Sequence, residues 1–66
     1  MILISVYNLQ EDIIAKHAAR LSGCKLYRSD KDIKQFESPL SNIYSARRLI
    51  SFFKGRGYQV TTQRLQ

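Results

Sequence analysis

Residues 24–37, with the sequence CKLYRSDKDIKQFE, decide the fold of this chain. Apolar and polar side chains alternate over 24–28 and again over 33–37, which is typical of strands with one buried face. Residues 29–32 (SDKD) lie between the two arms and have side chains that favour a turn. The pattern predicts a β-hairpin. The second arm would also tolerate a short helix from Asp32 to Glu37, so both alternatives stand at this point.

A strand and a helix are expected before the hairpin. Residues 2–7 place β-branched side chains on one face and predict a strand. Residues 10–22 place apolar side chains at helical spacing, with two acids in the first turn, and predict a helix that Gly23 ends in a left-handed cap. The apolar stripe expected to face the core consists of Ile13, Ile14, Ala18 and Leu21.

A second helix and a last strand are expected after the hairpin. Ser38-Pro39 opens the helix and Gly55 caps it. Its predicted core stripe consists of Leu40, Ile43, Ala46, Ile50 and Phe53, widened by Leu49. The positions expected in solvent are Ser41, Ser45, Arg48, Ser51 and Lys54. Residues 58–62 alternate again and predict a strand with Tyr58, Val60 and Thr62 on one face.

The predicted element order is β-α-β-β-α-β within one domain, residues 1–66. This order points to an α+β, ferredoxin-like arrangement with two helices on one face of a three- or four-stranded antiparallel sheet. The covered face is expected to contain Ile2, Ile4, Val6, Cys24, Leu26, Phe36, Tyr58 and Val60. The open face is expected to contain Leu3, Ser5, Tyr7, Lys25, Tyr27, Ile33 and Gln59. So short a chain has a net stability of roughly 3–5 kcal/mol, and a homodimer is one way to support its core.

The charge of the chain is positive and unevenly distributed. The sequence has 11 Lys and Arg against five Asp and Glu, a net charge of +6. Residues 1–40 contain six of the cations and all five acids. The cations of residues 41–66, which have no acid beside them, are Arg47, Arg48, Lys54, Arg56 and Arg64. Positive surfaces attract polyanions and acidic proteins, so the second segment is the first candidate for a binding face.

Composition disfavours several classes of function. Cys24 is the only cysteine, which excludes a disulfide within the chain and argues against a zinc site, so no metal or cofactor is expected. The apolar start is too short for a membrane span and lacks the basic region of a signal peptide. We therefore expect a cytoplasmic chain that does not bind membranes. His17 and Cys24 have no catalytic partner in the sequence, and no enzyme activity is expected.

The second predicted helix contains an aromatic and basic row. Tyr44, Arg48 and Phe52 lie at i, i+4 and i+8, with Arg47 and Lys54 near them. Such a row could contact bases and phosphates or bind a protein; alternatively, the rings cover the edge of the core, with Arg48 over one of them. The candidate binding residues are Arg47, Arg48, Lys54, Arg56, Arg64, Tyr44, Phe52, Tyr7, Tyr27 and Lys25.

Residues 4–9 (ISVYNL) resemble the first-strand signature of the RNA recognition motif family, which shares the predicted topology. The resemblance implies RNA contact on the open sheet face. Ser5 stands where that family has a stacking aromatic residue, so one ring of the platform is missing. The second signature of the family, a glycine- and aromatic-rich run on the third strand, has no counterpart in residues 32–37.

These observations predict a small basic binding module with two alternative kinds of partner. The first is DNA or RNA, bound by the cations and aromatic residues named above. The alternative is an acidic or nucleic-acid-binding protein, on which the chain would dock as a modulator or inhibitor. Inhibitors encoded by phages or mobile elements have this size.

Overall fold

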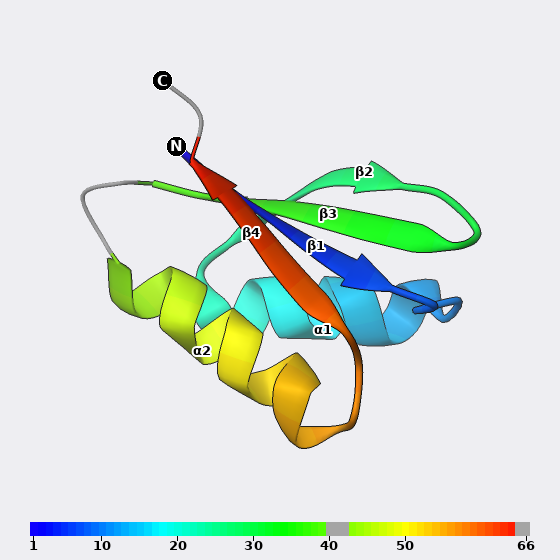
Figure 1. Cartoon of the computed structure of the whole chain (residues 1–66). Helices are drawn as coiled ribbons and strands as arrows, with labels where there is room; N and C mark the ends of the chain where they lie inside the picture. Colours follow the sequence, from blue (N-terminus) through cyan, green and yellow to red (C-terminus); the bar gives the residue numbers. More distant parts are fainter. Residues whose placement is uncertain (40–42, 65–66) are drawn as a thin grey trace.

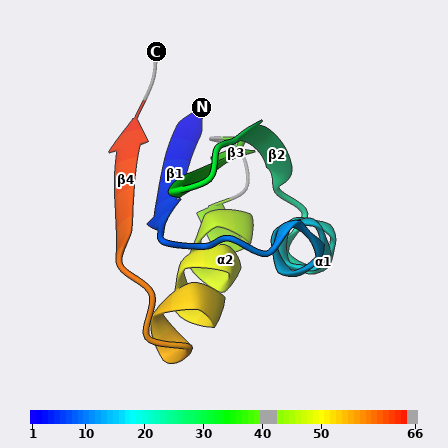
Figure 2. The same cartoon turned by 90° about the vertical axis from the view of Figure 1, so that its right-hand side faces the viewer.

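The computed structural model describes residues 1–39 and 43–64 of the chain. Its elements follow in the order β1, α1, β2, β3, α2 and β4 (Figure 1). Their bounds are Ile2–Tyr7 for β1, Asp12–Ser22 for α1, Lys25–Ser29 for β2, Ile33–Ser38 for β3, Ile43–Gly55 for α2 and Val60–Arg64 for β4. Both helices lie on the same face of the sheet, so the molecule has two layers (Figures 1 and 2).

The strands form one antiparallel sheet in the order β2-β3-β1-β4. Helix α1 connects β1 to β2, with β3 between them, and α2 connects β3 to β4, with β1 between them. This pair of split β-α-β units is the α+β, ferredoxin-like fold that the sequence predicted. Residues 33–38 pair with β1 along their whole length, so the alternative of a short helix at 32–37 is wrong.

The core lies between the two middle strands and α2. Ile4 and Val6 of β1 and Phe36 of β3 are fully buried, and Leu49 and Phe53 of α2 cover them. The rings of Phe36 and Phe53 have centroids 5.7 Å apart. The alternation of apolar residues in the two strands predicted this covered face correctly, because neighbouring residues of a strand point to opposite faces.

Helix α1 packs mainly through its small side chains, with Ile14 partly buried against the core. Its buried residues are Ala15, Ala18, Ala19 and Ser22. Ile13 and Leu21 are 83% and 61% exposed, so the predicted core stripe of this helix is wrong at these two positions. The distance between packed helices depends on the side chains at their contact, and the alanine face allows α1 to approach its neighbours closely.

Helix α2 also differs from its predicted pattern at two positions. Ile43, expected in the core, is 48% exposed, and Ser45, expected in solvent, is buried. Ser45 is buried because the end of α1 packs on it: its carbonyl oxygen accepts a hydrogen bond from the Cys24 thiol at 3.4 Å, and a Cβ at Gly23 would lie 3.3 Å from its Oγ. Gly23 has the predicted left-handed conformation, with φ of 80°. Leu40 lies outside the described residues.

Helix α1 begins later than the sequence predicted, and the predicted opening of α2 at Ser38 is wrong. α1 begins at Asp12 because Glu11 still has an extended backbone, with φ of −93° and ψ of 109°. Ser38 is the last residue of β3 and does not open α2, which begins at Ile43.

The end of α2 also lies further along the chain than expected. Gly57, and not Gly55, has the left-handed conformation, with φ of 88°. The amide of Tyr58 donates to the carbonyl oxygen of Phe53 at 3.0 Å, and the two rings meet edge to face. Tyr58 therefore belongs to the turn after the helix, and the last strand begins at Val60.

Lys34 is a buried cation on the helix-covered face of β3. It pairs with Val6 in the sheet, and its side chain is only 4% exposed. Its Nζ donates to the carbonyl oxygen of Asp30 at 2.8 Å and lies 3.1 Å from Oδ1 of Asp12. The same Oδ1 accepts a hydrogen bond from the hydroxyl of Ser29 at 3.0 Å. These contacts join the start of α1 to the turn between β2 and β3.

The Lys34 contact makes stability depend on the charge of Asp12. Hydrogen bonds from Lys34 and then from Ser29 hold the pKa of the Asp12 carboxyl below its ordinary value of 3.8. A carboxyl with a lowered folded-state pKa stabilises the fold above its ordinary pKa, and this contribution is lost as the pH falls through the folded-state value. We expect Asp12→Asn to be less stable than the wild type at neutral pH. Urea unfolding should show this difference shrinking below pH 3.8; a constant difference would contradict the expectation.

Candidate binding surface on the helix layer

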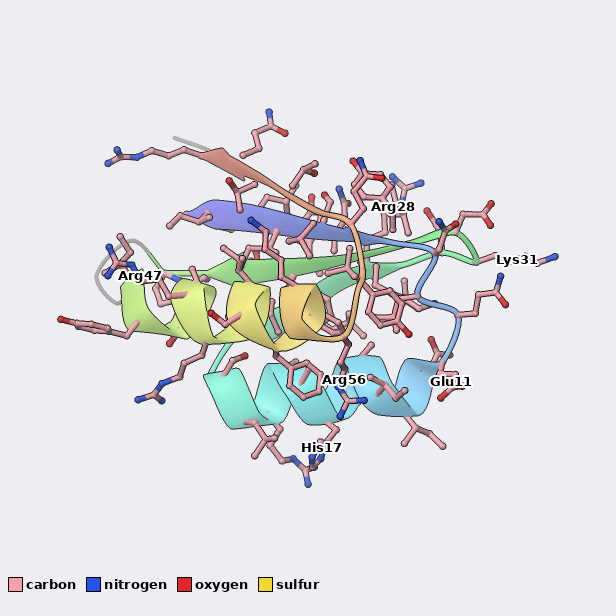
Figure 3. All side chains as sticks on the ribbon, turned by 60° about the horizontal axis from the view of Figure 1, so that its bottom comes forward. Glu11, His17, Arg28, Lys31, Arg47 and Arg56 are labelled. Carbon is pink, nitrogen blue, oxygen red and sulfur yellow. The ribbon has the colours of Figure 1, made fainter. Side chains whose placement is uncertain are left out.

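The positive charge of the chain gathers on the helix layer, which consists of α1, α2 and the turn at 55–57. The cations of this layer are Lys16, Arg20, Arg47, Arg48, Lys54 and Arg56. Its one carboxylate, Asp12, is bonded to Lys34. The other acids lie in the loops and on the sheet. Figure 3 shows Glu11 at the opposite end of the molecule from Arg47.

A groove opens between α1 and α2 with a volume of about 210 Å³. Its lining residues are Ala18, Leu21 and Ser22 of α1 and Arg48, Leu49 and Phe52 of α2. Leu21 is exposed and Phe52 packs against the edge of the core. The groove is therefore mostly apolar, and Arg48 is its charged group.

Arg56 lies over the ring of Phe52. Its guanidinium carbon is 4.5 Å from the ring centroid, and Phe53 meets the same ring edge to face at 5.1 Å. The sequence suggested Arg48 for this cation–π contact, but the turn after α2 brings Arg56 back over the helix instead. Figure 3 shows Arg56 and His17 projecting on the same outer face of the helix layer. One face of the Phe52 ring is therefore occupied.

The predicted cations of α2 do not form one row. Successive residues of a helix lie about 100° apart around its axis, so Arg47 and Arg48 point in different directions. Arg48 lines the groove. Arg47 belongs to a separate stripe at i, i+4, i+7 and i+11, which consists of Ile43, Arg47, Ile50 and Lys54. Tyr44 is exposed between the two. The structure therefore divides the predicted site into two flanks of one helix.

The sheet face that no helix covers contains two hydrogen bonds between side chains. Nε2 of Gln35 donates to Oγ of Ser5 at 3.1 Å, and the hydroxyl of Tyr7 lies 3.2 Å from Oγ1 of Thr61. Ser5 is buried by its neighbours and Tyr7 is half-buried. A platform for base stacking needs free rings, and the positions that resemble the RNA recognition motif do not provide them here.

Three further predicted site residues lie on the sheet, away from the groove. Lys25 stands opposite Glu37 in the pairing of β2 with β3. Tyr27 is exposed at the irregularity in β2, and Arg64 ends β4 at the other edge of the sheet. The structure does not bring these residues together with Arg48 and Arg56.

Sequence reasoning missed the contribution of α1 to this surface. Lys16, Arg20 and Leu21 are exposed on that helix. The net charge of residues 1–40 is close to zero, but most of the acids in this segment lie in loops. The net charge therefore does not show that α1 itself is basic. The signal was present in residues 13–22, which contain two cations at i and i+4 and no acid.

The described residues contain neither a cluster of metal ligands nor a helix that could span a membrane. Over residues 1–39 and 43–64, no three His, Cys, Asp or Glu side chains are grouped as a metal site requires. His17 is exposed, whereas the Cys24 thiol is buried against α2. No helix in these ranges is long and apolar enough to cross a membrane.

No protein-family model matches this chain, and neither does any curated protein or solved structure. The helix layer is distinguished by an apolar groove beside two arginines, and its one carboxylate, Asp12, is paired with Lys34.

Proposed function

We propose that this chain is a binding module without catalysis of its own, and that its partner is a protein with an acidic surface that docks at the groove between α1 and α2. The composition of the groove carries the proposal: Leu21 and Phe52 are apolar, and Arg48 and Arg56 stand beside them. Aromatic and arginine side chains dominate the binding energy of many protein interfaces. A protein partner offers an apolar side chain for the groove and carboxylates for the guanidinium groups.

Exposed aliphatic side chains favour a protein over a nucleic acid. Ile13 and Leu21 lie on the outer side of α1 and are the most exposed aliphatic residues of that helix. Exposed apolar side chains are typical of protein-binding surfaces, and of these two Leu21 lines the groove. DNA and RNA offer phosphates and flat bases instead, and the Phe52 ring already has Arg56 on one face. These contacts support the acidic protein, which was the alternative at the level of sequence.

Nucleic-acid binding is the second candidate, and the cations of the helix layer favour it. Binding to phosphates by Lys and Arg weakens steeply with salt. Fluorescence anisotropy with random DNA and RNA, at low and physiological salt, tests this candidate. An absence of binding at low salt would exclude it. If the chain binds nucleic acid in a salt-sensitive manner, and if Arg47→Glu and Arg48→Glu weaken this binding equally, the result would favour binding to phosphates over protein docking at the groove.

The protein-binding proposal is tested by two charge reversals on neighbouring residues of α2. Tagged wild-type chain is used to capture its partner from the source cells, and the affinity of the purified partner is then measured for Arg48→Glu and Arg47→Glu. We expect Arg48→Glu to weaken binding about tenfold or more, because a carboxylate would then face the carboxylates of the partner. Arg47→Glu should change the affinity less than about threefold, because Arg47 lies on the other flank.

The two variants are matched controls for each other. Both residues are exposed in the same helix, and both substitutions change the net charge equally. Equal losses would indicate attraction to the overall charge and not docking at the groove. Full affinity of the Arg48→Glu variant, or failure to capture any stoichiometric protein, would contradict the proposal.

A further inference from the structure

Strand β4 is an edge strand, and on its outer side it has no partner among residues 1–39 and 43–64. The amide of Tyr7 donates to the carbonyl oxygen of Gln59 at 3.0 Å. Hydrogen-bonded and non-hydrogen-bonded pairs alternate along an antiparallel ladder, so residues 59, 61 and 63 direct their backbone groups toward β1. The residues whose amide and carbonyl groups point outward are Val60, Thr62 and Arg64.

The two edges of the sheet differ in their protection. β2 has a register shift between Leu26 and Arg28, and Arg28 forms an ion pair with Asp30 at 2.8 Å. Bulges and charged side chains are means by which proteins prevent the addition of a foreign strand. β4 pairs with β1 without a shift from Val60 to Arg64. Its outer edge is therefore regular and can accept a further strand.

An uncovered flank of α2 adjoins this open edge. Figure 2 shows α2 beneath β1 and β3, with β4 extending beyond the helix. Phe52 lines the groove between α2 and α1. Ile50 lies about 200° around the helix from Phe52. The stripe that contains Ile50, together with Ile43 and Arg47, therefore faces away from α1. Ile43 is exposed, and Ile50 and Val60 are only partly buried.

We propose that β4 is a docking edge for an extended, acidic segment of a partner protein, which joins the sheet as a further strand. Main-chain hydrogen bonds to the outward groups of β4 would hold the segment, as in other cases of strand addition. Its apolar side chains would cover Ile43 and Ile50, and its carboxylates would pair with Arg47 and Arg64. A second copy of this chain fits the edge less well than an acidic segment, because the arginines of the second copy would lie close to Arg47 and Arg64 and repel them. The edge and the groove lie on opposite flanks of α2. The segment at the edge therefore belongs to a different partner from the protein that docks at the groove, and neither proposal depends on the other.

The test removes one outward amide. Proline at position 62 eliminates an edge donor but leaves the ladder to β1 intact, and proline is tolerated in edge strands at such positions. Peptides are selected on the wild-type chain from a display library of random linear peptides. We expect a group with alternating apolar and acidic residues that binds the wild type and Thr62→Val alike, and binds Thr62→Pro about tenfold more weakly or worse. Arg47→Glu should weaken these peptides, and Arg48→Glu should not.

Hydrogen exchange in the wild-type complex gives a second readout. The amides of Val60, Thr62 and Arg64 should become protected when a peptide of this group binds. Unprotected amides would overturn the proposal, even if Thr62→Pro proved unfolded by circular dichroism. It would also be overturned if no peptide binds, if every peptide binds Thr62→Pro normally, or if the sensitive peptides lack acids. Self-association of the wild type that Thr62→Pro abolishes would assign the edge to a second copy, against the proposal.

Discussion

Replacing Phe53 with alanine is expected to leave the chain without a stable folded state. The Phe53 ring is fully buried and its centroid lies 5.7 Å from that of Phe36, 5.1 Å from that of Phe52 and 5.7 Å from that of Tyr58. Truncating a core phenylalanine costs about 3–5 kcal/mol. A chain of this size has a net stability of only roughly 3–5 kcal/mol, so the loss is comparable with the whole. Far-UV circular dichroism and amide NMR dispersion measure the outcome.

Tyr44→Ala is the matched control for this substitution. Tyr44 is an aromatic residue of the same helix, but its side chain is exposed. Its truncation should change the free energy of unfolding by less than about 0.5 kcal/mol, as for most surface substitutions. A cooperative unfolding transition of Phe53→Ala close to that of the wild type would show that the core does not depend on this ring.

Reversing the charge of Lys34 is expected to have the second largest effect. A glutamate there would place a buried carboxylate beside the carbonyl oxygen of Asp30 and the carboxylate of Asp12, which are both acceptors. An uncompensated buried charge costs about 3–5 kcal/mol. We therefore expect Lys34→Glu to be largely unfolded at neutral pH. Urea unfolding followed by circular dichroism measures the change.

Lys34→Met separates the effect of charge from that of packing. Methionine retains an apolar stem, and replacing a buried ion pair by a side chain of similar volume is often close to neutral. Asp12 is largely exposed and stays hydrated without its partner. We expect a change within about 1 kcal/mol. Equal destabilisation by both substitutions would mean that the ammonium group itself, through its hydrogen bonds, holds the turn to α1.

The order of elements could be predicted from sequence because each strand has a local two-residue alternation. Ile4 and Phe36 belong to such patterns and form a pair in the sheet. The boundaries were less predictable, because they depend on backbone hydrogen bonds. Tyr58, for example, continues the alternation of β4, but its amide is taken by the carbonyl of Phe53 and the residue stays in the turn.

The faces of the helices were harder to predict than their existence. Helix α1 has two stripes that satisfy helical spacing, and only contact with α2 and the sheet selects the alanine stripe over the one with Ile13 and Leu21. Because the alanine stripe of α1 is buried, Leu21 lies at the groove. Arg47 and Arg48 are neighbours in sequence, but a helix turns them to different flanks, so a count of cations could not separate the two candidate surfaces.

The sequence by itself determined the fold class, the two-layer order of elements and the excess of positive charge, because alternation, helical spacing and composition are local or additive properties. The tertiary structure alone decided which helix faces are buried, that Asp12 of the helix layer pairs with Lys34, and that Arg56 covers Phe52. It also decided that β4 has the regular open edge. These features depend on contacts between segments that are distant in the chain. Local sequence preferences allow several arrangements equally well, and tertiary packing determines which of them forms.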